Sequence, residues 1–164
     1  MIILGIDPGL VNTGFAVINC IERQRFCVLN HGIIKTKSGT DTSTRLSFIF
    51  DELCKKLDGY DFKVAALEKT LINKNAVSSM DLAMSRGVVL LYFGKRRIKY
   101  DEYLPTFVKK IITGNGSADK ENIKSMIKYY IDFENSISLN LEKISHHEID
   151  AIAIAISCGF HRRN

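Results

Sequence analysis

The pattern of hydrophobic and polar positions predicts strands at the start of this chain and helices interleaved with strands later. Residues 2–6 form a continuous apolar run, which is typical of a strand covered on both faces. The segments 13–20 and 25–36 are rich in β-branched and aromatic residues. The short loops between these three runs predict an antiparallel three-stranded opening.

A helical period replaces this pattern in the segment 41–60. Behind a Thr/Ser cap, apolar side chains recur there at helical spacing, namely Leu46, Ile49, Phe50, Leu53 and Leu57. The run 62–68 then returns to a buried strand. A second helix follows over 75–93, and one of its faces carries Val77, Met80, Met84, Gly87, Val88 and Leu91. Residues 98–105 predict a short strand that ends at Pro105.

Two more helices complete the chain. A helix from residue 119, with Ser117 as its cap, has a buried stripe of Ile123, Met126, Ile127 and Tyr130. In the segment 145–160 alanine and isoleucine alternate as in a strand, but its length, its alanine content and a capping Ser145 favour a buried helix. We find no internal repeat or linker, and we expect a single α/β domain over 1–164.

Composition and charge narrow the class of protein. With 164 residues, 46% of them hydrophobic, the chain can bury a core without disulfides, and its four cysteines have no metal-like spacing. No apolar run approaches the ~20 residues of a membrane span, and the N-terminus does not resemble a signal peptide. We therefore expect a cytoplasmic protein with no membrane association. The net charge of +5 is concentrated in clusters such as 94–99 and 108–110, which suits a polyanionic partner.

Two of the buried runs end in a carboxylate, Asp7 and Glu68. Ligands of α/β sheets gather at strand ends, so these side chains face each other if the two strands are neighbours. Two like charges in that position are costly unless a cation lies between them. Oxygen ligands favour Mg²⁺ or Mn²⁺ over zinc.

The last helix adds Asp150, with His147 one turn before it and His146 also on that side. Glu148 points roughly 160° away from Asp150 and is the weaker ligand candidate. Together with Asp7 and Glu68, the pair His147 and Asp150 would form a two-metal site of the kind that cleaves phosphodiesters. Each acid also has a plain structural alternative, since Asp7 suits a turn, Glu68 a surface ion pair and Asp150 a first helical turn.

Four segments together resemble the bacterial RuvC family of Holliday-junction resolvases. They are GIDPGLVNTGFAVI (5–18), LEK (67–69) with NKNAVSSMDLAMSRGVVLL (73–91), VKKIITGNGSADKENIKSMI (108–127) and HHEIDAIAIAI (146–156). The resemblance implies an RNase H-like α/β fold with a mixed five-stranded sheet flanked by helices. It also implies a homodimeric, metal-dependent endonuclease that resolves four-way DNA junctions by paired symmetric nicks with 5′-phosphate ends, in recombination and repair.

The family further implies two Mg²⁺ ions per active site, with Mn²⁺ as an alternative, and a branch-migration complex as partner. By motif, Asp7 and Glu68 match the first two catalytic acids, and His147 and Asp150 match the closing pair, so all four are expected metal ligands. Lys109 and Lys120 match basic residues near the scissile phosphate, although both also suit solvated surfaces. The residues expected to contact DNA are Lys69, Leu71, Asn73, Lys74, Asn75, Arg86, Lys109, Lys110, Lys120 and Lys124.

This sequence departs from the family at two positions. The third ligand is His147 where many members have Asp, and its softer imidazole favours Mn²⁺. Leu71 follows the second acid where many members have an aromatic residue that stacks on bases, so Leu71 or Ile72 is left as an apolar wedge. The helix from near Asn75 is the family's dimerisation element, and its small residues Ala83, Ser85 and Gly87 permit close packing.

Three other functions compete with a junction resolvase. An RNase H-like nuclease that processes RNA shares the strand-end acids, but the basic segments around Lys109 and Lys120 argue against it. An actin-like ATP-binding module needs about twice this length and a second phosphate loop, which we do not find. A non-catalytic junction-binding protein would not need the four retained metal-ligand candidates.

Overall fold

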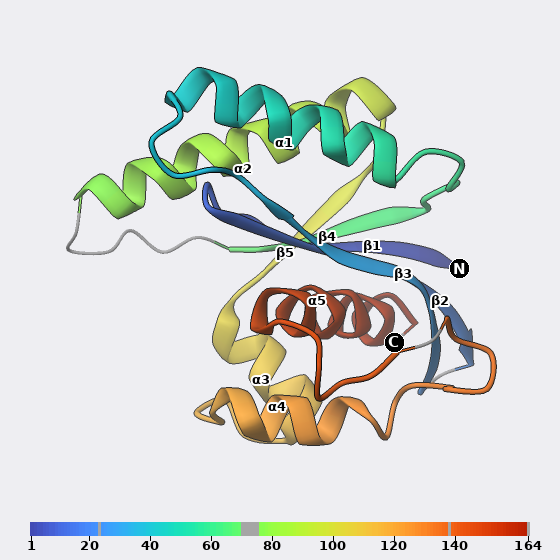
Figure 1. Ribbon diagram of the computed structural model, residues 1–164. Helices are drawn as coiled ribbons and strands as arrows, with labels where there is room; N and C mark the ends of the chain where they lie inside the picture. Colours follow the sequence, from blue (N-terminus) through green and yellow to red (C-terminus); the bar gives the residue numbers. More distant parts are fainter. Residues whose placement is uncertain (23, 70–75, 138, 164) are drawn as a thin grey trace.

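A mixed five-stranded sheet forms the centre of the computed structural model, which describes residues 1–22, 24–69, 76–137 and 139–163 (Figure 1). The strands are β1 (Ile2–Asp7), β2 (Asn12–Glu22), β3 (Arg25–Lys35), β4 (Val64–Glu68) and β5 (Tyr100–Tyr103), in the order β3-β2-β1-β4-β5. β1, β2 and β3 are antiparallel neighbours, while β4 is parallel to β1 and β5 to β4. The predicted opening and the mixed sheet are confirmed.

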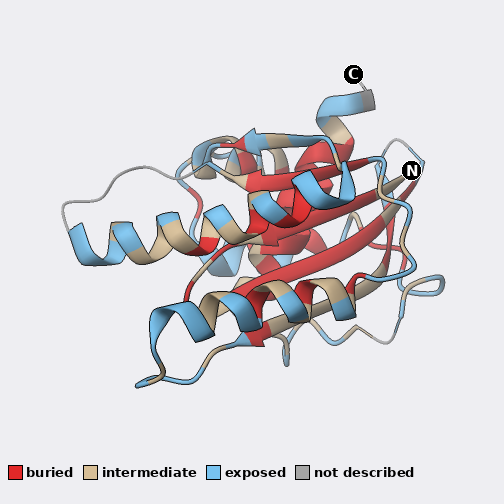
Figure 2. Ribbon diagram, turned by 90° about the horizontal axis from the view of Figure 1, so that it is seen from above, coloured by how far each residue is buried: buried red, intermediate tan, exposed pale blue. Residues whose placement is uncertain are grey.

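Helices cover both faces of the sheet, and a separate apolar cluster fills each side (Figure 1). α1 (Thr42–Lys56) and α2 (Ala76–Arg96) lie on one face. α3 (Pro105–Thr113), α4 (Lys120–Ile127) and α5 (His146–Arg163) lie on the other. Figure 2 shows that the buried residues concentrate in the central strands. Residues 151–159 of α5 are all buried, so their alternation of alanine and isoleucine carried no information about a face.

Two helices begin with a different capping residue from the one predicted, and a third helix was not predicted at all. α1 is capped by Asp41, which accepts from the Thr44 amide at 3.0 Å, instead of by a Thr or Ser. α4 is capped in the same way by Asp119 and not by Ser117. In both cases a carboxylate satisfies a free amide and also faces the positive end of the helix dipole. Pro105 ends the short strand as expected but begins α3, a helix that the sequence pattern did not indicate.

The predicted cap of α5 is confirmed. Ser145 Oγ accepts from the Glu148 amide at 3.3 Å, and the Ser145 amide donates to Glu148 Oε2 at 2.9 Å. This reciprocal pair is a capping box. Glu148 Oε1 also lies 2.8 Å from Nδ1 of His31 on β3, so the first turn of α5 is bonded to the sheet.

Much of the apolar face of α2 is exposed to solvent. Val77 is 71%, Met80 64% and Leu91 51% exposed. The buried positions are Ser85, Val89, Tyr92 and Phe93, so Ser85 does not lie on the exposed side of the helix that a second copy could contact. In the described part of the chain, α2 alone has the length and composition to cross a membrane. Because its inner side packs against the sheet and α1, we interpret it as a core helix with an exposed apolar side.

We predict that Gly5→Ala destabilises the protein strongly. A Cβ at Gly5 would lie 2.1 Å from the Ala151 carbonyl oxygen, and backbone atoms of α5 cannot move away locally. The free energy of unfolding should fall by about 2–3 kcal/mol or more, measured by urea denaturation. Gly94→Ala is the control, because nothing lies within 4 Å of a Cβ there, and it should raise stability by up to about 1 kcal/mol. An unchanged urea midpoint for Gly5→Ala would contradict this packing.

Candidate active site

Adjacent strands place Asp7 and Glu68 side by side at one edge of the sheet. β1 and β4 are parallel, and Ile6 pairs with Leu67, so the two acids follow directly at the same level. Neighbouring strands lie about 4.8 Å apart. The condition set out in the sequence analysis, that the two acids end neighbouring strands, is therefore met, and both side chains are only partly exposed.

α5 brings two more ligand candidates to this edge. Gly14 of β2 pairs with Asp7, and a Cβ at Gly14 would lie 2.1 Å from the His147 carbonyl oxygen. The glycine therefore permits the first turn of α5 to approach the sheet. His147 Nδ1 lies 2.7 Å from Asp7 Oδ2, whereas His146 is exposed and does not line the cavity.

One cavity of about 300 Å³ collects all six residues expected to act in catalysis. Its lining residues are Asp7, Glu68, Pro105, Val108, Lys109, Lys120, Ile123, His147, Asp150 and Ile154. Lys109 comes from α3 and Lys120 from the start of α4, and Lys120 Nζ lies 3.3 Å from Asp150 Oδ2. Five elements, two strands and three helices, thus contribute to a single site.

The negative charge of the acids in this cavity is only partly neutralised by the positive charge of the nearby lysines. Burial raises the pKa of Glu68 to about 7, with the charges of Asp7 and Asp150 adding to the effect and Lys120 and Lys109 opposing it. Burial and the Asp7 charge also raise the pKa of Asp150. The hydrogen bond with Asp7 raises the pKa of His147. These directions show that the cavity favours additional positive charge.

The donor set suits a hard divalent cation. Carboxylate oxygens of Asp7, Glu68 and Asp150 with one imidazole nitrogen match the ligands that Mg²⁺ and Mn²⁺ accept. Within the ranges that the structure describes, no three His, Cys, Asp or Glu side chains are already arranged around a common ion. Instead His147 is hydrogen-bonded to Asp7 and Lys120 pairs with Asp150, so Lys120 supplies part of the positive charge that the acids attract, as does His147 when it is protonated.

The other residues expected to contact DNA are distributed unevenly. Lys110 and Lys124 lie on α3 and α4 near the cavity, and Lys69 is exposed directly after Glu68. Arg86 of α2 is engaged within the protein, because it donates to the Glu68 carbonyl at 3.0 Å and pairs with Glu102. Leu71, Asn73, Lys74 and Asn75 lie outside the described residues, as does Ile72.

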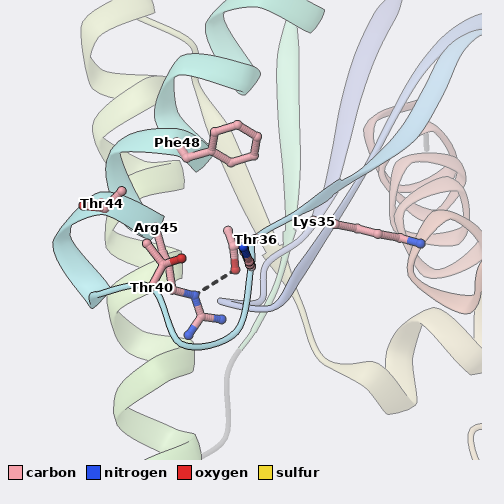
Figure 3. A pocket seen from close by; sticks show the side chains of 7 residues that line it. Lys35, Thr36, Thr40, Thr44, Arg45 and Phe48 are labelled. Atoms are coloured by element: carbon pink, nitrogen blue, oxygen red, sulfur yellow. Dashed lines mark hydrogen bonds between the residues drawn. The ribbon is translucent and has the colours of Figure 1, made fainter.

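Side chains that the sequence analysis did not single out hold the turn after Asp7. Thr36 donates to the Leu10 carbonyl at 2.6 Å and accepts from Arg45 Nε at 2.9 Å. Figure 3 shows this Arg45 side chain reaching from α1 to Thr36, beside a second cavity of about 230 Å³. Thr13 closes the same turn by donating to the Gly9 carbonyl at 2.8 Å. The Ser-x-x-Glu spacing at 145–148, a capping-box pattern, is a sequence signal for a different support, the one at the start of α5.

Comparison with known proteins identifies the family to which the chain is similar. The family model described as "Crossover junction endodeoxyribonuclease RuvC" matches residues 3–158. Curated relatives with that name include one from Wolbachia sp. subsp. Drosophila simulans (strain wRi), 40% identical over 94% of this chain and 91% of its own length. Another, from Anaplasma marginale (strain St. Maries), is 36% identical over 100% of this chain and 96% of its own length.

A solved structure shows the same fold. The structure "T. thermophilus RuvC in complex with Holliday junction substrate" superposes with a TM-score of 0.89 at 23% identity, covering 99% of this chain and 95% of that one. This likeness confirms the RNase H-like architecture expected from sequence. With the match of the family model over residues 3–158, it follows that the chain belongs to the crossover junction endodeoxyribonuclease RuvC family.

Proposed function

We propose that this protein is a metal-dependent endonuclease that resolves four-way DNA junctions by paired symmetric nicks with 5′-phosphate ends. The observation that carries the proposal is the convergence of Asp7, Glu68, His147 and Asp150 with two lysines in one cavity. The relatives are named as crossover junction endodeoxyribonucleases, which hydrolyse phosphodiester bonds. A structural neighbour was solved with a Holliday junction substrate.

We assign Asp7, Glu68, His147 and Asp150 as the residues that hold the metal, two Mg²⁺ or Mn²⁺ ions per active site. When bound, such ions stabilise the attacking and leaving oxygens of phosphodiester hydrolysis. The raised pKa of Glu68 supports this assignment, because a nearby cation favours its ionised form. The imidazole of His147 is a softer ligand than a carboxylate and favours Mn²⁺.

Lys109 and Lys120 supply positive charge to the scissile phosphate. Lys120 is 59% exposed and pairs with Asp150, so its ammonium group can contact a phosphate at the mouth of the cavity. Positive charge held there stabilises the negative charge that develops on the phosphate during cleavage. Lys69, Lys110 and Lys124 extend this basic surface and hold the DNA backbone.

The exposed face of α2 supports a homodimer. Val77, Met80 and Leu91 present apolar surface to solvent, and the small exposed residues Ala83 and Gly87 lie on the same helix. A two-fold dimer would present two active sites to two strands of a junction with matching symmetry. We place this dimer in the cytoplasm beside a branch-migration complex, in recombination and repair.

The alternatives from sequence differ in substrate. An RNA-processing nuclease would cut RNA in preference to a four-way junction. A non-catalytic junction-binding protein would bind the junction and leave it intact. An actin-like ATP-binding module would bind ATP and show no cleavage of either nucleic acid.

The central test is incubation of the protein with a synthetic four-way junction. We expect cleavage only with Mg²⁺ or Mn²⁺ present, at symmetric positions on two opposed strands, with ends that a ligase can reseal. Denaturing gels with each strand labelled in turn map the cuts. Linear duplex and an RNA hairpin of the same length are the controls, and faster cutting of either one would contradict the proposal.

Asp7→Asn and Glu68→Gln should each lower the junction cleavage rate by more than about 100-fold, or more than about 2.7 kcal/mol of transition-state stabilisation. Each variant loses a metal-binding charge but keeps the basic surface, so its Kd for the junction should stay near that of the wild type. Glu142→Gln, a change to an exposed acid outside the cavity, is the control. Wild-type cutting by either active-site variant would refute the metal assignment.

The two neighbouring histidines give a sharper test of the helix register. His147→Ala should lose most of the cleavage activity, because Nδ1 of His147 lies 2.7 Å from Asp7 Oδ2. His146→Ala should cut at a rate close to wild type, because its side chain lies outside the cavity. Both rates are measured on one labelled junction with saturating Mn²⁺. Loss of activity in His146→Ala alone would mean that the register of α5 is wrong.

For the dimer, Met80→Glu and Leu91→Glu should each shift the protein toward single chains of 18.5 kDa, because a charge would be buried at the interface. Light scattering after size-exclusion chromatography measures the mass. Tyr129→Glu is the control, because Tyr129 is 70% exposed and closely follows α4, a helix on the opposite face of the sheet from α2. Equal masses for all four proteins would exclude α2 as the interface.

A further inference from the structure

Three side chains at the start of α5, those of His147, Glu148 and Asp150, have different tasks. His147 and Asp150 line the catalytic cavity, whereas Glu148 points away from it and is buried. Residues 147 and 150 lie on one side of a helix, and residue 148 is turned about 100° from residue 147. Anything that fixes Glu148 therefore fixes the rotation of the helix and the direction of both ligand candidates.

Glu148 is fixed by three hydrogen bonds. Its Oε2 accepts from the Ser145 amide at 2.9 Å and from Ser145 Oγ at 2.8 Å, and its Oε1 lies 2.8 Å from His31 Nδ1. A carboxylate only accepts, so Nδ1 of His31 is the donor when Glu148 is ionised. The Ser145 bonds are local to the helix end, and in the described residues the His31 bond is the one that connects the Glu148 side chain to another element.

That connection reaches an edge strand. His31 lies on β3, at one edge of the sheet, and its side chain is 14% exposed. The other end of α5 is connected to the opposite edge strand, β5, where His161 Nδ1 lies 3.2 Å from Tyr103 Oη and Arg162 pairs with Asp101. α5 is thus bonded at its two ends to the two edges of the sheet, and only the β3 end is next to the ligand candidates.

We propose that His31 is a positioning residue for the metal centre, acting through Glu148. By holding the Glu148 carboxylate on the β3 side, it keeps that acid out of the cavity and keeps His147 and Asp150 directed toward Asp7. Loss of the bond leaves Glu148 hydrogen-bonded only to Ser145 of its own helix end in the described residues, so the carboxylate no longer connects the first turn of α5 to β3. This inference rests on the proposed metal-dependent function.

The test compares four proteins, namely wild type, His31→Ala, His31→Asn and His161→Ala. Asparagine places an amide nitrogen near the position of Nδ1 and preserves the bond to Glu148. His161→Ala removes a histidine contact from the same helix at its far end, so it is the matched control for a general loss of α5 packing. Urea denaturation establishes that each variant is folded under assay conditions.

Two readouts are measured, the Mn²⁺ concentration at which half of the metal-induced rise in Tm occurs and the cleavage rate at saturating junction. For His31→Ala we expect the Mn²⁺ midpoint to rise and the rate to fall by about tenfold each, as for residues that orient metal ligands elsewhere. The Kd for the junction should not change. His31→Asn and His161→Ala should stay within about twofold of wild type in both readouts.

Two results would overturn the proposal. Either His31→Ala matches wild type in both readouts, or His161→Ala loses as much as His31→Ala, which would indicate a general effect of helix packing. Failure of the proposed function itself would give a different result in these two measurements. In that case the wild type itself neither cuts the junction nor gains Tm with Mn²⁺.

Discussion

The close packing of α5 on β1 and β2 is the constraint on which the site depends. Gly5 and Gly14 leave no side chain where the Ala151 and His147 carbonyl oxygens lie, so the helix backbone rests directly on the strands. This contact brings His147 within 2.7 Å of Asp7 although the two residues are 140 positions apart in sequence. The first turn is bonded to β3 through Glu148 as well, so packing and hydrogen bonding fix the same end of the helix.

This arrangement concentrates negative charge in one place. Asp7, Glu68 and Asp150 share one partly buried cavity, and burial together with mutual repulsion raises the pKa of Glu68 to about 7. Lys120 on α4 offsets part of that charge, and His147 on α5 is hydrogen-bonded to Asp7. A buried cluster of this kind stabilises nothing by itself, which is why we connect it with a cation and a phosphate and not with the stability of the fold.

Most strands and helices could be predicted from the sequence, because local patterns indicate them. The strands and the α5 cap followed from local patterns, since an apolar run before Asp7 or Glu68 and a serine three residues before Glu148 are visible in the chain. For α2, periodicity identified an apolar side of the helix but not what covers that side. Val77 and Met80 face solvent while Ser85 lies in the core. The caps Asp41 and Asp119 were missed because serines and threonines nearby were equally good candidates.

The sequence by itself determined which residues stand at strand ends and on which turn of a helix they lie, because these depend on local conformation and short spacings. It also determined the family, through four segments whose order and spacing are specific. Only the tertiary structure decided which groups meet. The pairing of His31 with Glu148 and of Arg86 with the Glu68 carbonyl joins residues 117 and 18 positions apart. Such contacts arise from packing across the sheet, and no local pattern encodes them.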